Sequence, residues 1–355
     1  MTGHVPETVG HDAENTGHAL PKYGSLQLAR RCTLKSGKVA LISGGGSGHE
    51  PLHTGFIGHG MLDAACPGQV FTSPTPDQML AAAQEVDTGA GVLFIVKNYS
   101  GDMMNFQMAA EMLDCDNATV IINDDVAVEN STHTTGRRGV AGTVLVERIV
   151  GAAAERGEGL SELKALGDAL NKSTASMGVA LTSCTVPATG SPTFQIGADE
   201  MEMGVGIHGE PGRRRVKLNT AEEIAAELTG AVLKDLSLER GQEVFLLVNG
   251  FGGTPLMELY VMVHAANQVL AGAGVKPVRY LTGSCVTSLE MAGSRSLSVR
   301  LTRRRLRCGT CLFTRRPFAG GCKAARAGHL PAAHLALPLE HPARVLGGQP
   351  THALQ

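Results

Sequence analysis

The feature that most constrains the fold is a repeated alternation of short apolar runs and longer amphipathic segments. Three continuous apolar runs, at residues 38–43, 91–99 and 118–124, are short enough to be strands covered on both faces. The segments between and after them have the apolar spacing of helices, at residues 77–86, 104–113, 143–157 and 160–173. This repetition predicts an α/β fold with a mostly parallel sheet.

A second set of the same elements follows a polar break, Asn-Lys-Ser-Thr, at residues 171–174. Apolar runs predict strands at residues 178–186, 243–250 and 277–283. Amphipathic segments predict helices at residues 221–235 and 255–274. We therefore predict two α/β domains whose mostly parallel or mixed sheets are covered by helices. Their expected bounds are residues 37–175 and 176–293.

Both ends of the chain are atypical. Residues 1–36 have weak periodicity, and residues 294–355 contain 11 Lys and Arg but one acidic residue, Glu340, in a chain of net charge −2. Neither stretch predicts a strand or a helix. The charge reversal favours a shifted reading frame in a GC-rich gene, with a basic extension that binds an acidic partner as the alternative.

Composition excludes several classes of protein. The 355 residues are 43% hydrophobic, which argues against a disordered chain, and no apolar run is long enough for a membrane span. Only 4% are aromatic and Trp is absent, which argues against a nucleic-acid surface built on base stacking. The chain begins without a basic start followed by an apolar stretch, and its cysteines are scattered, so we expect free thiols and a cytoplasmic location.

Cysteines and histidines also gather in the basic tail. Cys308 and Cys311 form a C-x-x-C pair, with Cys322, His329 and His334 downstream. The second half of this set is badly spaced for a zinc finger or ribbon, so no metal is expected.

A glycine-rich loop, Ser-Gly-Gly-Gly-Ser-Gly-His-Glu-Pro, follows the first strand at residues 43–51. Serial glycines let the backbone approach a ligand closely. The loop is not a P-loop, because His49 and Glu50 stand where Lys and Ser or Thr are required, and the Rossmann spacing also fails. The alternative is a glycine turn with a surface histidine.

Two further loops carry reactive side chains. Lys97 and Asp102 follow an apolar strand, where they could polarise and deprotonate a substrate hydroxyl; a solvated lysine and a helix-capping aspartate are the alternative. His208 stands among glycines, where a neutral imidazole could act as nucleophile or base rather than as a structural turn residue.

Asp124 and Asp125 could bind a metal, although capping is the commoner role.

Taken together, these loops resemble the DhaK family, the dihydroxyacetone-binding subunits of dihydroxyacetone kinases. The resemblance covers about residues 37–293. Its motifs include GKVALISGGGSGHEP, VKNYSGDMMNF, NDDVAV, EMGVGIHGEPG and TSLEMAG, in this order along the chain.

The resemblance implies a site where the two domains meet. His208 would add to the ketone of dihydroxyacetone and hold it as a hemiaminal. Asp102 would act as the base on the substrate hydroxyl, and His49 would assist the proton network. The substrate-binding residues that it implies are Gly46, Ser47, His49, Lys97, Asp102 and His208.

The resemblance also implies that the chain forms a homodimer and has no cofactor of its own. ATP or ADP with Mg²⁺ would be carried by a separate DhaL-type subunit. Two alternatives differ in kind. Some relatives bind dihydroxyacetone as non-catalytic transcriptional co-activators, but His49 and Asp102, which a sensor has less need of, are both present. The atypical ends instead suggest a defective remnant.

Overall fold

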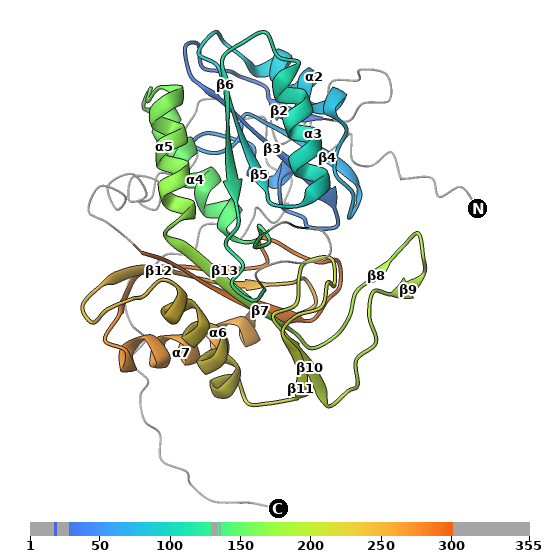
Figure 1. Cartoon of the computed structure of the whole chain (residues 1–355), viewed down its shortest axis with the longest axis vertical. Helices are drawn as coiled ribbons and strands as arrows, with labels where there is room; N and C mark the ends of the chain where they lie inside the picture. Colours follow the sequence, from blue (N-terminus) through green and yellow to red (C-terminus); the bar gives the residue numbers. More distant parts are fainter. Residues whose placement is uncertain (1–17, 20–27, 129–133, 135, 301–355) are drawn as a thin grey trace, which may run out of the picture. The chain divides into compact units, whose positions relative to one another are not determined.

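The first three apolar runs form neighbouring strands of one sheet. The computed structural model describes residues 18–19, 28–128, 134 and 136–300. Within these residues six strands pair in the order β1-β2-β4-β3-β5-β6, and β4, β3, β5 and β6 are parallel (Figure 1). The strands are β1 (His18–Ala19), β2 (Ala29–Arg31), β3 (Ala40–Ser47), β4 (Ala64–Val70), β5 (Val92–Lys97) and β6 (Asn117–Ile122).

Helices cover both faces of this sheet because alternate strand residues are apolar on both sides. Phe94 packs with α2 (Pro76–Val86) and α3 (Ser100–Glu111). Leu93 and Ile95 face the opposite way, into a core built with α4 (Gly142–Glu155) and α5 (Leu160–Asn171). The predicted strands and helices of the first half are therefore confirmed. A short 3-10 helix, η1 (Thr54–Phe56), follows the glycine-rich loop.

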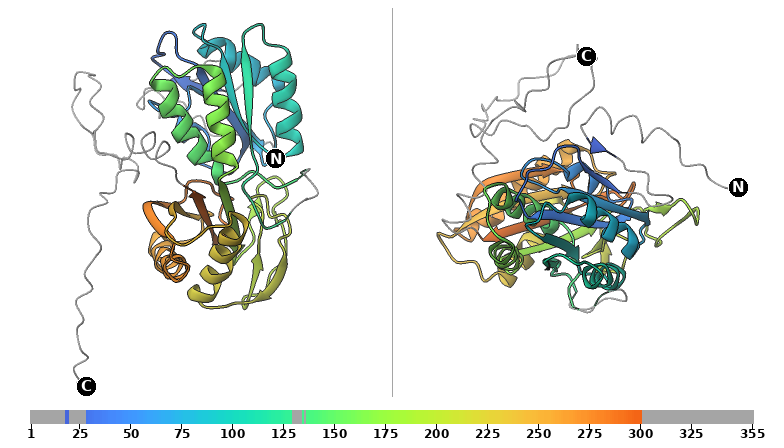
Figure 2. Two further views of the ribbon diagram at one scale, coloured as in Figure 1. Left: turned by 60° about the vertical axis from the view of Figure 1, so that its left-hand side comes forward. Right: turned by 90° about the horizontal axis from the view of Figure 1, so that it is seen from above.

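The second sheet is mixed, in the order β11-β10-β7-β14-β12-β13, and only β12 and β13 are parallel. Its strands are β7 (Thr174–Ala180), β10 (Glu200–Met203), β11 (Arg214–Lys217), β12 (Glu243–Gly250), β13 (Lys276–Gly283) and β14 (Gly293–Arg300). Helices α6 (Ala221–Asp235) and α7 (Leu256–Gly272) lie together on one face, as Figure 2 shows. A two-stranded hairpin, β8 (Thr185–Val186) with β9 (Ser191–Pro192), projects from this half.

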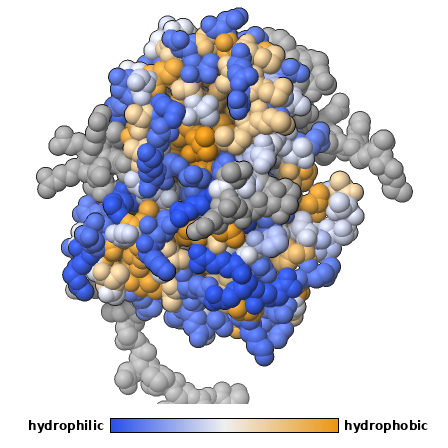
Figure 3. Space-filling model, viewed as in Figure 1, coloured by the Kyte–Doolittle hydropathy of each residue, from blue (hydrophilic) through white to orange (hydrophobic). Residues whose placement is uncertain are grey.

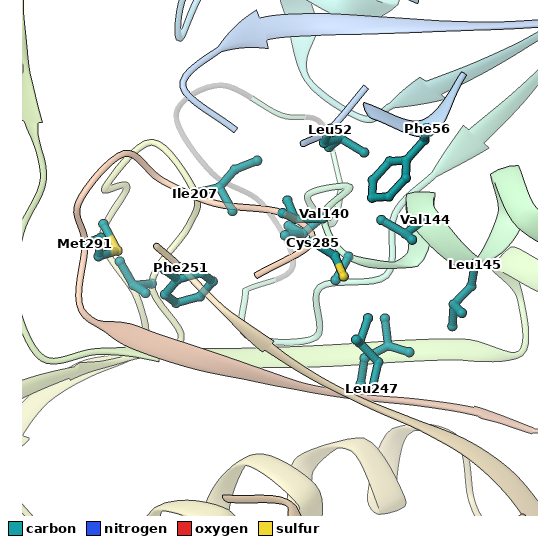
Figure 4. Packing of buried hydrophobic residues seen from close by; sticks show 14 of the residues in the cluster. Leu52, Phe56, Val140, Val144, Leu145, Ile207, Leu247, Phe251, Cys285 and Met291 are labelled. Atoms are coloured by element: carbon teal, nitrogen blue, oxygen red, sulfur yellow. The ribbon is translucent and has the colours of Figure 1, made fainter. Parts of the chain in front are cut away.

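The other face of the second sheet packs against the first half of the chain. Leu247 of β12 and Phe251 share one buried cluster with Phe56 of η1 and Val144 of α4 (Figure 4). Both sheets consequently belong to one compact unit. The expected domain bounds meet at residues 175 and 176, which both lie inside β7, and the division into two domains stays a prediction.

Strand β14 corrects the sequence analysis, which expects no strand after residue 293. It lies in the middle of the second sheet, between β7 and β12. Its Ser-Leu-Ser-Val segment alternates small polar and apolar residues, and Leu297 and Val299 enter the shared core. Ser296 instead faces Thr229 of α6. The Arg-rich composition hides this period of two. The expected reading-frame shift spans residues 294–355, of which 294–300 form part of this central strand. The remaining residues of the tail, 301–355, with its cysteine and histidine cluster, lie outside the described residues.

Exposed apolar side chains mark parts of the surface. Met104 and Met108 lie on one face of α3, with Met112 at its C-cap, and Ile121 of β6 is also exposed. Figure 3 shows apolar surface in the upper half of this view, where β6 and α3 lie. No helix among the described residues is both long and apolar enough to cross a bilayer.

Candidate active site

The glycine-rich loop crosses closely over the segment that follows β4. A Cβ on Gly46 would lie 2.6 Å from the backbone nitrogen of Thr72, so a larger residue would displace one of the two backbones. The hydroxyl of Ser47 donates to the carbonyl oxygen of Gly68 at 2.7 Å. Gly46 and Ser47 thus fix the path of the loop that carries His49.

The loop brings two histidines from distant parts of the chain into contact. His49 Nε2 and His208 Nε2 are 3.1 Å apart, although the residues are separated by 159 positions. His49 Nδ1 donates to the carbonyl oxygen of Thr287 at 2.8 Å, and His208 Nδ1 lies 2.8 Å from Glu210 Oε1. His49 is buried, whereas the His208 side chain is 21% exposed and is therefore the more accessible nucleophile.

Hydrogen-bond accounting fixes the protons of this pair. Both Nδ1 atoms face oxygen acceptors and must carry hydrogen, so neutral rings would oppose two bare Nε2 lone pairs at 3.1 Å. One proton therefore lies between the Nε2 atoms. Burial, reinforced by His208 and Lys97, holds the pKa of His49 well below its ordinary value.

Glu210 is a site residue that the sequence analysis missed. Burial would raise its pKa, but the His208 ring and Arg138 outweigh burial and hold the pKa below its ordinary value. Its Oε2 also accepts from the backbone nitrogen of His208 at 2.9 Å. The Glu210 carboxylate thus sets both the tautomer and the orientation of the His208 ring. Its position two residues after His208, in a loop of small residues, was the available signal.

Two aromatic rings enclose the histidine pair. Phe71 stacks on His49 at 4.9 Å between ring centroids and meets His208 edge-on at 5.1 Å. Tyr99 meets His208 edge-on at 4.8 Å. The sequence analysis did not select Phe71 or Tyr99, although Tyr99 lies within the VKNYSGDMMNF motif. These rings restrict the His208 imidazole to one orientation.

Lys97 and Asp102 lie together at the carboxyl end of β5. Lys97 Nζ is 3.4 Å from Asp102 Oδ2, and both side chains are buried. The pair is reached from the same sheet edge as His49, because β3 and β5 are parallel. Asp102 lies in the first turn of α3, where an anionic side chain is favoured by the helix dipole.

Asp124 and Asp125 have structural roles, as the commoner reading of this pair expects. Asp124 accepts from the backbone nitrogens of Val140 and Gly142 at the start of α4. Asp125 pairs with the buried guanidinium groups of Arg138 and Arg295. Among the described residues no cluster of three or more His, Cys, Asp or Glu is arranged to hold a metal ion.

Those two arginines hold the strand-to-loop segment before His208. Arg138 donates to the carbonyl oxygen of Gly204 at 2.7 Å, and Arg295 donates to that of Val205 at 2.9 Å. The His208 loop is consequently anchored to the middle of the second sheet through β14. A cavity of about 400 Å³ opens between this loop and the β8–β9 hairpin, with His208, Glu210 and Thr193 in its wall.

Comparison with known proteins identifies the family. The Dak1 domain matches residues 17–308. The dihydroxyacetone-binding subunit DhaK of PTS-dependent dihydroxyacetone kinase 1 from Listeria innocua is 55% identical over 273 residues, which are 76% of this chain and 83% of that protein.

Two solved structures extend the comparison to the fold. The dihydroxyacetone kinase operon co-activator Dha-DhaQ superposes with a TM-score of 0.79 at 33% identity, over 86% of this chain and 96% of the other. The dihydroxyacetone kinase of C. freundii in complex with AMP-PNP and Mg²⁺ superposes with a TM-score of 0.76 at 30% identity, over 94% of this chain and 64% of the other. The chain belongs to the Dak1 domain family.

Proposed function

We propose that this chain is the dihydroxyacetone-binding subunit of a dihydroxyacetone kinase and that it holds its substrate covalently on His208. The observation that carries the proposal is the contact between His49 Nε2 and His208 Nε2 at 3.1 Å. His208 Nε2 is the nucleophile and belongs to a residue in the cavity wall, and His49 Nε2 is the proton acceptor in contact with it. The names of the relatives support a ketose as the substrate.

The addition step balances with the groups present. The proton between the rings passes to His49, which frees the lone pair of His208 Nε2 to form a bond with the carbonyl carbon. As the C=O π bond breaks, His49 returns its proton to the carbonyl oxygen and a hydroxyl forms. His208 becomes a cationic, N-alkylated imidazole whose Nδ1–H stays paired with the Glu210 carboxylate. An alcohol without a carbonyl, such as glycerol, cannot form this bond.

Phosphoryl transfer then needs a terminal hydroxyl of the bound substrate to lose its proton. We assign Asp102 as the acceptor of that proton, with Lys97 beside it as the balancing charge. A DhaL-type partner subunit would supply the phosphoryl group from ATP or ADP held with Mg²⁺. The nucleotide complex of the C. freundii kinase supports such a donor. Gly46 and Ser47 would shape the wall of the pocket through the loop they fix.

The assembly itself is part of the proposal. A homodimer and a DhaL-type subunit each require a surface, and the described residues leave two apolar helix faces uncovered. One is the methionine face of α3, whose first turn carries Asp102. The other lies near the start of α7, where Met257 is 75% exposed. These faces are available to the two kinds of partner.

A carbon-13 NMR spectrum of dihydroxyacetone labelled at the carbonyl tests the covalent step. Wild-type protein should convert part of the ketone signal to a tetrahedral-carbon signal, and His208→Ala should not. Asp102→Ala is the matched control, because it keeps the nucleophile and should keep the signal while losing turnover with a DhaL-type subunit. A folded wild-type protein without the signal would refute the proposal.

A regulatory role is the second candidate, and the similarity to the co-activator Dha-DhaQ favours it. A dihydroxyacetone sensor would share the His208 adduct but would have no use for the base. Turnover measured with a DhaL-type subunit separates the two functions. Adduct formation without any turnover across partners would support the sensor, and turnover that Asp102→Ala abolishes would support the kinase.

A further inference from the structure

The Lys97 ammonium is surrounded by acceptors that the proposed mechanism does not all use. Its Nζ lies 3.2 Å from the carbonyl oxygen of Gly44, 3.0 Å from His53 Nε2 and 3.4 Å from Asp102 Oδ2. An ammonium has three N–H donors and no acceptor, so these three contacts saturate it. The side chain is 1% exposed, and its charge is therefore held by these groups rather than by solvent.

The His53 ring can accept from Lys97 in one tautomer only. Because Lys97 donates to Nε2, that nitrogen must be bare and the hydrogen of a neutral ring must lie on Nδ1. His53 Nδ1 faces Glu147 Oε1 at 2.8 Å, and both side chains are buried. Burial, together with the charges of Lys97 and His49, lowers the pKa of His53, in agreement with a neutral ring. Glu147 thus selects the tautomer that Lys97 needs.

The backbone at Gly45 prevents the Lys97 ammonium from moving toward the glycine-rich loop. A Cβ on Gly45 would lie 2.3 Å from Lys97 Nζ and 3.4 Å from His53 Nε2, so the loop closes directly over their contact. Among the residues that the structure describes, the only carboxylate that forms an ion pair with the ammonium is that of Asp102. Without the His53 acceptor, the donor left unpaired would turn toward the Asp102 carboxylate and pair with it more closely.

We propose that His53 and Glu147 are positioning residues for Lys97, which keep its ammonium from pairing fully with Asp102. This inference rests on the proposed function, in which Asp102 accepts the proton of the substrate hydroxyl. A carboxylate that is only partly paired keeps more of its basicity than one paired closely with an ammonium. The His53–Glu147 dyad would then set the strength of the base without touching substrate.

Two substitutions of one residue separate this role from a merely structural one. His53→Gln places an amide oxygen near the position of Nε2, where it still accepts from Lys97. His53→Asn reaches only the Nδ1 position, so it keeps a donor for Glu147 but loses the Lys97 contact. With a DhaL-type subunit, we expect His53→Gln to stay close to wild type in kcat. His53→Asn should lose up to about 100-fold in kcat at an unchanged KM for dihydroxyacetone.

The pH profile gives a readout that loss of packing would not move. Closer pairing with Lys97 makes Asp102 a weaker base, so the acidic limb of the kcat profile of His53→Asn should move to lower pH. The carbon-13 adduct signal should persist in both variants, because His208 is untouched. An adduct in all three proteins with equal kcat in His53→Asn and His53→Gln would overturn the dyad's role. A wild type with neither adduct nor turnover would overturn the proposed function instead.

A measurement on the wild-type protein keeps the inference falsifiable if His53→Asn does not fold. Nitrogen-15 correlation spectra distinguish the two neutral tautomers of histidine from the protonated ring, and the spectrum of His53→Gln identifies the His53 signal. We expect the neutral Nδ1–H tautomer of His53 near neutral pH. A protonated ring or the Nε2–H tautomer would overturn the inference, because neither can accept from Lys97.

Discussion

Replacing Glu147 by Gln should make the protein more stable at alkaline pH, by an amount that the structure sets. Glu147 is completely buried, and burial raises the pKa of its carboxyl from 4.5 to about 8, while Lys97 and the Ser43 hydroxyl act in the opposite direction. The folded chain therefore holds a proton that the unfolded chain has already released between these two pH values. Glutamine imitates the protonated acid, since its oxygen can still accept from His53 and it does not titrate.

The magnitude follows from linkage. Each unit of pKa difference is worth about 1.4 kcal/mol, and the difference between 4.5 and about 8 gives roughly 5 kcal/mol. Because the folded-state pKa is raised, this stability is fully present below pH 4.5 and is lost as the pH rises toward about 8. Glu147→Gln should therefore match the wild type in acid and exceed it in stability by roughly 5 kcal/mol above pH 8.

Urea unfolding followed by circular dichroism, repeated across this pH range for both proteins, measures the difference. Taking the difference cancels the other titrating groups. Glu155→Gln is a matched control of opposite sign, because hydrogen bonds and charge from Arg31 outweigh burial and lower the pKa of Glu155. That variant should lose stability relative to wild type as the pH rises. A Glu147→Gln difference that does not change with pH would refute the reasoning.

Three further predictions concern other parts of the structure. Gly46→Ala should cost about 1–3 kcal/mol in unfolding free energy and weaken the carbon-13 adduct signal, because its Cβ would lie 2.6 Å from the Thr72 nitrogen; titration with labelled dihydroxyacetone checks this. Asp124→Ala should cost about 3 kcal/mol in thermal or urea unfolding, since the Ser176 hydroxyl and two backbone donors lose a buried acceptor. Cys66 should resist iodoacetamide until the protein unfolds, because burial raises the pKa of its thiol to about 12; labelling measured by peptide mass spectrometry checks this.

The sequence is sufficient to predict the fold where burial alone decides the pattern. Strands β3, β5 and β12 lie where continuous apolar runs predict them, because each is covered on both faces, and β6 also lies where its run predicts it, although Ile121 is exposed. Strand β14 was missed for the same reason in reverse. Ser296 faces Thr229 of α6, and Arg295 is buried where it pairs with Asp125, so neither residue type signals burial in the sequence.

Some residues of the candidate site could likewise be predicted from the sequence, whereas the contacts between them could not. Lys97 and Asp102 could be selected because they follow a strand, and His208 because glycines surround it. The contact between His208 and His49 could not be derived from the residues alone, since it depends on how the two sheets pack. His53 and Glu147 are 94 positions apart, so only the folded chain brings them together next to Lys97.

The central position of β14 has a consequence for how the protein is made. A ribosome produces β7, β10, β11, β12 and β13 before it reaches residue 293, yet β7 and β12 become neighbours of one sheet only through β14. Until then, each exposes an unpaired strand edge, which is a site of mispairing with other chains. The first sheet has no such delay, because its described strands end at Ile122. We therefore expect the second half of the nascent chain to depend most on chaperones, and the second sheet to be completed by the last of its described strands.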